Sequence, residues 1–295
     1  MPPAASPADL AADPTEVTAE IGVIGGSGFY TWLDHAVPVS VRTPFGEPSE
    51  LPVVGQVNGR SVAFIPRHGR DHRFAPHRVN YRANLWALRE LGVRQVIGPC
   101  AVGSLRADLG PGTLVVPDQA IDRTSGRAHT IFDADGTTDA DGARGWGSSL
   151  AHVAFADPYC RRGRHAVLAA AADAGWPAVD GGTLVVVNGP RFSTRAESRW
   201  HAAAGGDLVG MTGLPEASIA RELALCYTSV AVVTDLDAGV EHGEGVTHAE
   251  VMQTFARSVT RLQSVLSRVV AELLPDSACP CRRALDGLHV PFTVD

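Results

Sequence analysis

The chain has 295 residues, of which 45% are hydrophobic and 19% charged, and its formal net charge at pH 7 is -7. This length and apolar content are sufficient for one large core, and no long polar linker divides the chain. A negative charge without a basic stripe argues against a nucleic-acid partner, and no apolar run approaches the ~18 residues of a membrane span.

Residues 1–17 are rich in proline, alanine and aspartate and lack the basic start and apolar run of a signal peptide. We therefore expect a flexible tail there, one domain over residues 18–275, and an extension over residues 276–295. Five cysteines fit a reducing cytoplasm. Cys279 and Cys281 form a C-P-C pair, either as ordinary thiols or as a redox or disulfide pair, and two cysteines alone do not make a zinc site.

Short apolar runs with many β-branched residues predict buried strands. They occupy residues 21–24, 62–65, 95–97, 113–116, 184–187, 208–211 and 227–233. Leu85, Leu88 and Leu91 recur at helical spacing, and Pro215 and Glu216 are typical of a first helical turn, in a helix that we expect to reach about residue 224. This alternation predicts an α/β fold with a mixed or largely parallel central sheet flanked by helices, in which ligands bind where strands end.

The clearest helix comes last, before Pro275, and its apolar stripe is expected to pack in the core. The stripe consists of Met252, Phe255, Val259, Leu262, Leu266, Val269 and Leu273. Residues 125–149 are rich in glycine and aspartate, which suggests calcium. The EF-hand spacing fails, because position 138 is threonine where glycine is needed and no glutamate closes the loop. We interpret this segment as a mobile surface or lid loop.

Two polar segments directly follow predicted strands. Residues 24–28 read Ile-Gly-Gly-Ser-Gly, where glycines favour an inward-facing set of N–H groups and Ser27 adds a hydroxyl, although a plain tight turn explains them equally well. Residues 66–70 read Pro-Arg-His-Gly-Arg. There Arg67 is suited to a bidentate grip on an oxyanion and His68 to the donation of a further hydrogen bond, with ordinary surface charge as the alternative.

Three further segments carry polar groups suited to a ligand. In residues 188–198, Phe192 offers a flat face for an aromatic ring, while Thr194 and Glu197 have the spacing of a capping box. Thr212 precedes a helix start, a favourable place for phosphate. Asp235 and Asp237 follow the strongest strand, where burial of the pair would raise one pKa and leave a proton to donate; capping or a turn is the alternative.

Six segments together resemble the methylthioadenosine phosphorylase branch of the trimeric purine nucleoside phosphorylases. They are GGSGF, PRHGR, NYRANLWAL, GPRFSTRAES, MTGLPEA and TDLDAG, in this order, within a match over residues 21–274. The resemblance implies a single-domain nucleoside phosphorylase fold, a cytoplasmic homotrimer, and inorganic phosphate as a co-substrate. It implies neither a cofactor nor a metal.

The resemblance also implies two groups of site residues. The phosphate-binding residues are Ser27, Arg67, His68, Cys100, Ala101 and Thr212, although many relatives carry a hydroxyl residue at the position of Cys100. The nucleoside-binding residues are Phe192, Ser193, Met211, Asp235, Leu236, Asp237, His248, Val251 and Met252, with His152 reaching the 5′ pocket of a neighbouring subunit.

The implied catalysis rests on Asp235 and Asp237. As phosphate attacks the anomeric carbon, a protonated Asp235 supplies a proton or a hydrogen bond to N7 of the purine. Asp237 accepts a hydrogen bond from the 6-amino group, which favours adenine. We expect methylthioadenosine as the main substrate. Adenosine or another 5′-modified adenosine is the alternative, because methylthio-selective relatives place a small apolar residue at His248. A histidine that points to solvent is also compatible with the sequence.

Three other activities compete with this hypothesis. A nucleosidase that uses water has no need of the anion-binding groups. A dinucleotide-dependent oxidoreductase would require the glycine fingerprint, which fails at Tyr30 and Thr31. A non-catalytic nucleotide-binding protein would have no reason to combine an acid at Asp235 with a phosphate site.

Overall fold

The computed structural model describes residues 12–13, 17–132, 150–238, 240, 246–290 and 292. Eleven strands form one sheet whose main path runs β2-β3-β4-β1-β5-β10-β9-β7, while β11 pairs with β5 and β6, and β8 with β6. The strands are β1 (Ile21–Gly25), β2 (Asp34–Pro38), β3 (Val53–Val57), β4 (Arg60–Pro66), β5 (Gln95–Ser104), β6 (Leu114–Val116), β7 (Gln119–Arg123), β8 (Val179–Asp180), β9 (Thr183–Val187), β10 (Leu208–Gly210) and β11 (Cys226–Leu236).

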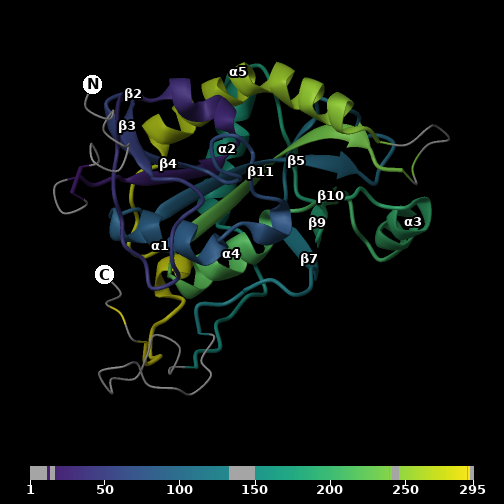
Figure 1. Ribbon diagram of the computed structural model, residues 1–295. Helices are drawn as coiled ribbons and strands as arrows, with labels where there is room; N and C mark the ends of the chain where they lie inside the picture. The colour runs from purple at the N-terminus through teal and green to yellow at the C-terminus, as the bar shows by residue number, and fades with distance from the viewer. Residues whose placement is uncertain are drawn as a thin grey trace, which may run out of the picture.

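Helices cover both faces of the sheet. They are α1 (Tyr81–Glu90), α2 (Arg161–Asp173), α3 (Arg195–Ala203), α4 (Gly213–Glu222) and α5 (His248–Glu272), with short 3-10 helices η2 (Ser27–Trp32), η3 (Pro76–Arg78) and η4 (Pro280–Arg283). In Figure 1, α2 and α5 lie above the sheet and α1 and α4 below it, while α3 lies apart at one end. The expected α/β fold with a mixed sheet flanked by helices is confirmed.

The central strands are hydrophobic along their length because both of their faces are covered. One cluster of buried side chains joins the sheet to α1 and α4, and a second joins it to α2 and α5. In the final apolar stripe, Leu262, Leu266 and Val269 are fully buried. Met252 is 46% exposed, so the expectation of core packing is wrong at that end of α5.

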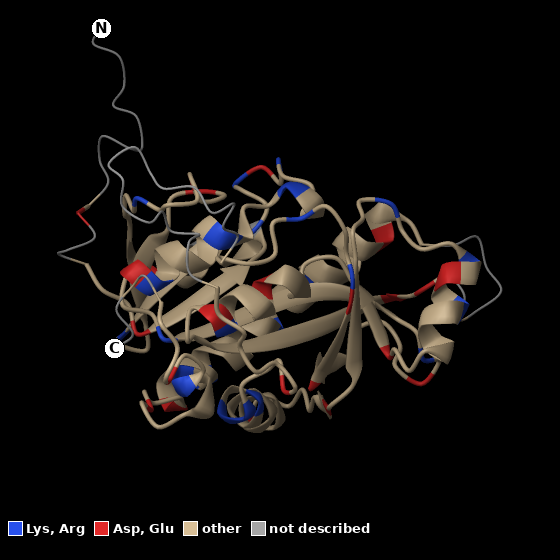
Figure 2. Cartoon of the chain, turned by 90° about the horizontal axis from the view of Figure 1, so that it is seen from below, with Lys and Arg blue, Asp and Glu red and all other residues tan. Residues whose placement is uncertain are grey.

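Each predicted strand is present, although β5 continues to Ser104, well past the expected end. Strands β2, β3, β7 and β8 were not predicted, because exposed and polar residues interrupt the apolar pattern of the first three and β8 has only two residues. Within the described residues, no helix has the length and apolarity needed to cross a membrane. Figure 2 shows acidic and basic residues interspersed along the described chain, without a basic stripe.

The two ends of the chain pack more closely than expected where they are described. Ala12, within the expected tail, forms a parallel bridge with Val39. In the expected extension, Cys279, Cys281 and Leu285 are buried, so this segment folds back onto the domain. Residues 1–11, 14–16 and 133–149 lie outside the described residues, and with them the aspartates that suggested calcium, namely Asp133, Asp135, Asp139 and Asp141.

Candidate active site

Two strands approach each other along one edge of β5. β1 runs parallel to β5 beside residues 95–97, whereas β10 runs antiparallel beside residues 103–104. β11 occupies the other edge of β5 along its length. The C-terminal ends of β1 and β10 therefore meet beside residues 98–102 of β5, and we call this place the strand junction. Ends of strands that meet in this way are a usual ligand-binding place in α/β sheets.

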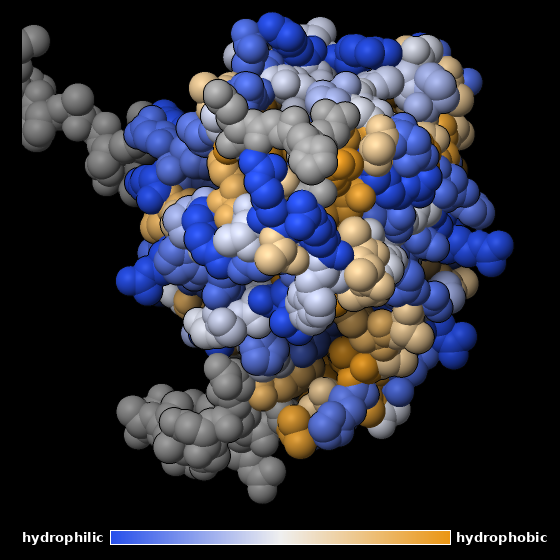
Figure 3. Space-filling view, turned by 90° about the vertical axis from the view of Figure 1, so that its right-hand side faces the viewer, coloured by the Kyte–Doolittle hydropathy of each residue, from blue (hydrophilic) through white to orange (hydrophobic). Residues whose placement is uncertain are grey.

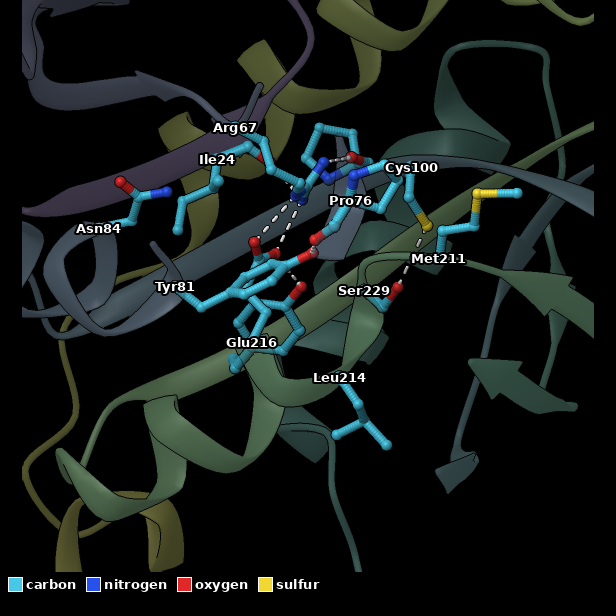
Figure 4. Close-up of polar contacts among 12 residues, drawn as sticks. Ile24, Arg67, Pro76, Tyr81, Asn84, Cys100, Met211, Leu214, Glu216 and Ser229 are labelled. Carbon is cyan, nitrogen blue, oxygen red and sulfur yellow. Dashed lines mark hydrogen bonds and ion pairs between the residues drawn. The ribbon is translucent and has the colours of Figure 1, made fainter. Parts of the chain in front are cut away.

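Arg67 follows β4 and reaches the strand junction. Its Nε and Nη2 atoms donate to the two carboxylate oxygens of Glu216, each at 2.8 Å, and both side chains are buried. Nη2 also donates to the carbonyl oxygen of Ile24, and Nη1 to that of Pro99. Figure 4 shows the guanidinium facing Glu216. Four of the five N–H groups are thus engaged within the protein, which leaves one for a ligand.

Glu216 stands in the first turn of α4, as expected, but its carboxylate turns into the core toward Arg67. The Tyr227 hydroxyl donates to the same carboxylate at 2.6 Å, and burial raises the pKa of Tyr227 well above its usual value. Burial alone would lower the pKa of Arg67, but the Glu216 carboxylate raises it above its ordinary value. The predicted bidentate grip is therefore made on Glu216. Phosphate binding by Arg67 stays a prediction that rests on its charge and its remaining N–H.

His68, the next residue, is held as a neutral ring. Burial and the Arg67 charge lower the pKa of His68 to about 4. Its Nδ1 lies 2.8 Å from the carbonyl oxygen of Phe74, and because a carbonyl only accepts, Nδ1 carries the proton. The ring stacks on His72 with centroids 4.3 Å apart. The remaining nitrogen, Nε2, therefore presents an acceptor lone pair rather than a donor.

The other predicted phosphate residues border the strand junction. Cys100 and Ala101 lie in its centre, on β5, and the buried Cys100 Sγ is 3.7 Å from the Ser229 hydroxyl. Burial raises the pKa of Cys100, so it is a thiol rather than a thiolate. Thr212 is buried beyond the end of β10, where its side chain does not cap α4. The side chain of Ser27 lies outside the described part of the structure.

The glycines around Ser27 do not form the inward-facing set of N–H groups that the sequence suggested. None of Gly25, Gly26 and Gly28 adopts the positive φ that an anion nest requires. A Cβ on Gly28 would instead lie 3.0 Å from Val259 of α5. These glycines allow close packing of the turn against its neighbours.

Asp235 and Asp237 lie at the C-terminal end of β11. Burial raises the pKa of Asp235 to about 6, a hydrogen bond from Thr234 opposes this, and Asp237 adds to the increase. Asp237 is 3% exposed, and its Oδ2 has no hydrogen-bond partner among the described residues. Gly103 lies opposite Asp235 on β5, where a Cβ would come within 2.8 Å of Asp235 Oδ1. The pair therefore combines a carboxyl that protonates readily with a buried free acceptor.

The predicted base-binding residues gather at this end of the sheet. Phe192 and Ser193 are half-buried just before α3, where the capping box of Thr194 and Glu197 is confirmed. Arg195 in the first turn of α3 donates to the carbonyl oxygen beyond the acidic pair at 2.9 Å. Half-buried Leu236 separates the two aspartates. The structure thus brings the Phe192 segment and the acidic pair together.

Arg127 was not predicted, yet it organises this region. Its Nη1 donates to the carbonyl oxygens of Met211 and Leu214, and its Nη2 to those of Val187 and Asn188, at 2.8–3.1 Å. It thereby joins the ends of β9 and β10 and positions Met211 at the strand junction. No local pattern marks this arginine, because it lies in the glycine- and aspartate-rich loop.

The first turn of α5 lies over the site. His248 is exposed at the start of the helix, and it adds to burial in lowering the pKa of His72, so the two rings are near each other. Glu250 contributes to the raised pKa of Asp235. The beginning of α5 therefore spans the distance between the histidine pair and the acidic pair.

The remaining predicted residues are near the surface. Val251 is half-buried, whereas Met252 and His152 are exposed. Figure 3 shows hydrophobic patches among hydrophilic surface on the side of the molecule that carries α3. Trp200 of α3 is 51% exposed. Within a single chain, His152 is therefore not part of the site formed by the other predicted residues.

Comparison with known proteins gives a consistent result. The model of the family described as "Phosphorylase superfamily" matches residues 20–271. A purine nucleoside phosphorylase of Streptomyces coelicolor is 59% identical over 280 residues, which cover 92% of this chain and 96% of that protein. An S-methyl-5′-thioadenosine phosphorylase of Mycolicibacterium smegmatis is 53% identical, with 92% and 98% covered. The crystal structure of a methylthioadenosine phosphorylase from an antarctic soil metagenomic library superimposes with a TM-score of 0.83 at 37% identity, with 94% of each chain covered.

Proposed function

Because the chain belongs to the phosphorylase superfamily, we propose that it cleaves the N-glycosidic bond of S-methyl-5′-thioadenosine with inorganic phosphate. The products are adenine and 5-methylthioribose 1-phosphate, so the enzyme is a pentosyltransferase that requires no cofactor. The observation that carries this proposal is the raised pKa of Asp235, close to a buried free acceptor on Asp237.

Asp235 acts on the leaving group. As the bond to the anomeric carbon breaks, its two electrons pass to the purine, and the proton of Asp235 passes to N7, so that the base leaves as a neutral molecule. A free Oδ2 on Asp237 accepts from the 6-amino group of adenine. A 6-oxopurine would place an acceptor against this acceptor and would leave both unpaired. The acidic pair therefore favours adenine.

Phosphate occupies the strand junction. Asp235 lies opposite Gly103, two residues along β5 from Ala101, a separation of about 7 Å along the strand. A ribose between the phosphate and the purine bridges such a distance. Phosphate attacks the anomeric carbon from there, and its negative charge stabilises the oxocarbenium-like sugar.

His68 contributes an acceptor to this phosphate. Since Nδ1 is committed to Phe74, neutral His68 offers Nε2 to the P–OH group of monohydrogen phosphate. When the new C–O bond forms, that proton leaves the phosphate through the hydrogen bond to Nε2 and passes to solvent, because a ring with a pKa of about 4 does not retain it, and Asp235 regains a proton from solvent. The overall balance is one proton lost by phosphate and one gained by adenine. Thr212 and the remaining N–H of Arg67 complete the donors to the phosphate oxygens.

The 5′ substituent distinguishes two substrates. His248 at the start of α5 is suited to a 5′-hydroxyl, while Val251 and Met252 keep that wall partly apolar for a methylthio group. Replacement of His248 by valine should raise the preference for methylthioadenosine over adenosine; an unchanged preference would remove His248 from the 5′ site.

We also propose a cytoplasmic homotrimer in which His152 of one subunit completes the 5′ site of its neighbour. Its exposure on a single chain and the free state of all five cysteines support this assignment. Light scattering measures the assembly. A His152→Ala variant that assembles normally should show a raised KM for the nucleoside.

Release of adenine from methylthioadenosine and from adenosine, each with and without phosphate, tests the proposed function. Phosphate-dependent release from methylthioadenosine is the expected result. Phosphate-dependent release mainly from adenosine would keep the reaction and change the substrate. Release without phosphate would show a hydrolase, and the assignment of the strand junction to phosphate would be wrong.

A further inference from the structure

Four of the five cysteines meet at the end of the sheet opposite the acidic pair. Cys160 is the N-cap residue of α2, Cys226 is the first residue of β11, and Cys279 and Cys281 belong to the segment around η4. All four are buried and unpaired by disulfides, and their sulfur atoms lie within 4.8 Å of one another. Three segments far apart in the sequence thus contribute thiols to one cluster, which we call the cysteine cluster.

The spacing of the sulfur atoms matches tetrahedral metal coordination. The Sγ atom of Cys279 lies 3.4 Å from that of Cys226 and 3.8 Å from that of Cys160. Zinc binds thiolate sulfur at about 2.3 Å, so the edges of a regular ZnS4 tetrahedron measure about 3.8 Å. A disulfide would require about 2.05 Å between two sulfur atoms. The four sulfurs therefore surround a centre of the size that zinc occupies.

The surroundings favour a negatively charged centre. Four thiolates and Zn²⁺ carry a net charge of -2, and the Arg221 guanidinium donates to Cys281 Sγ at 3.9 Å. Cys160 stands at the N-terminus of α2, where the helix dipole favours negative charge. A surface pocket beside Cys226 is lined by several arginines, including Arg94 and Arg162. Positive charge therefore reaches the cluster from Arg221 and from the N-terminus of α2, whereas Arg162 in the pocket pairs with Asp276.

Backbone hydrogen bonds hold the ligand positions in place. The N–H of Cys160 donates to the carbonyl oxygen of Tyr227 at 2.7 Å, and that of Cys226 to the carbonyl oxygen of Arg94 at 2.9 Å. These bonds hold two of the ligands on the sheet side, and the C-terminal segment supplies the other two. All four ligands come from the protein and are buried, as in structural zinc sites, which leave no coordination position open.

We propose that Cys160, Cys226, Cys279 and Cys281 bind one structural Zn²⁺ ion, with each thiol giving its proton to solvent. This site revises the sequence-based expectation that the protein binds no metal. The ion joins residues 276–290 to α2 and β11. β11 spans 11 residues, so the site lies about 30 Å from Asp235. Zinc therefore stabilises the fold and does not take part in the reaction.

The untagged full-length protein, expressed with zinc in the medium and purified without chelators, provides the first test. Elemental analysis should find about one zinc per chain. Native mass spectrometry should show the chain plus one zinc, and denaturing conditions should show the fully reduced mass. Cobalt exchanged for zinc should give the visible absorption of a tetrahedral cobalt thiolate. A metal-free chain, whether its thiols are free or joined as disulfides, would overturn the proposal.

Matched variants locate the ligands. C279S should lose most of the bound zinc and unfold at a lower temperature, whereas C100S changes a buried cysteine outside the cluster and should retain the full zinc content. Removal of zinc from the unmodified protein by a chelator should lower its unfolding temperature, and added zinc should restore it. Equal zinc content in C279S and C100S would refute the assignment, and the metal analysis of the unmodified protein remains decisive if C279S does not fold.

Discussion

The replacement of Asp235 by asparagine should make the protein more stable at neutral pH and much less active. Burial raises the pKa of Asp235 from its ordinary 3.8 to about 6. That increase corresponds to a loss of about 3 kcal/mol of folding stability at neutral pH, because the folded protein then holds a carboxylate in poorly hydrated surroundings. Asparagine stays neutral, and its carbonyl oxygen can still accept the hydrogen bond from Thr234.

The pH dependence has a definite sign. A carboxyl whose folded pKa is raised contributes its full stability below pH 3.8, and this contribution is lost as the pH rises through about 6. The variant should therefore match the unmodified protein near pH 4 and exceed it by about 3 kcal/mol above pH 6. Urea unfolding at several pH values, at one fixed protein concentration, measures this difference.

Activity should change in the opposite direction. Loss of the proton donor should lower kcat/KM for methylthioadenosine by about 10²–10⁴-fold, and the decline of kcat/KM above pH 6 that we expect of the unmodified protein should be absent from the variant. The exposed Asp34→Asn variant is a matched control for the loss of one charge. If both variants and the unmodified protein share one pH dependence of unfolding, the buried-carboxyl reasoning is refuted.

Three further changes test the surroundings of the site. Gly103→Ala places a Cβ 2.8 Å from Asp235 Oδ1 and should lower kcat by about 100-fold at nearly normal stability; unchanged kinetics would mean that the carboxylate position is unimportant. Glu216→Gln leaves the Arg67 charge unpaired and should cost about 3–5 kcal/mol in urea unfolding, whereas a cost below about 1 kcal/mol would contradict a buried ion pair. Arg127→Lys loses part of four carbonyl contacts and should cost about 2–4 kcal/mol, with a raised nucleoside KM; normal values for both would rule out its positioning role.

Local patterns in the sequence predicted the parts of this fold that depend on neighbours in the chain. Apolar β-branched runs located the central strands, and the spacing of Thr194 and Glu197 predicted the capping box that begins α3. Asp235 and Asp237 were selected because two carboxylates follow a strongly hydrophobic strand, where burial is unavoidable. Strand and helix chemistry of this kind acts over a few residues and is therefore visible in one sequence.

Contacts between segments far apart in the chain could not be predicted from local sequence patterns. Arg67 and Glu216 are 149 residues apart, and no pattern within either segment indicates that one neutralises the other. The antiparallel direction of β10, which brings Thr212 to the middle of β5, likewise depends on how the chain crosses the sheet. In the sequence, Cys279 and Cys281 are too few to indicate a metal site, and only the fold brings Cys160 and Cys226 next to them.

The charges at the strand junction support the proposal that an anion binds there, even though the Arg67 fork is occupied. Arg67 and Arg127 are both buried, but Glu216 neutralises only the first. Arg127 donates hydrogen bonds only to carbonyl and hydroxyl oxygens among the described residues and lies over the Tyr81 ring. Its Nε has no hydrogen-bond partner there, and burial lowers its pKa. His68 adds no charge, since its pKa is about 4. Arg127 therefore forms no ion pair among the described residues; Asp122 offsets its charge only in part, and a bound phosphate would offset it further.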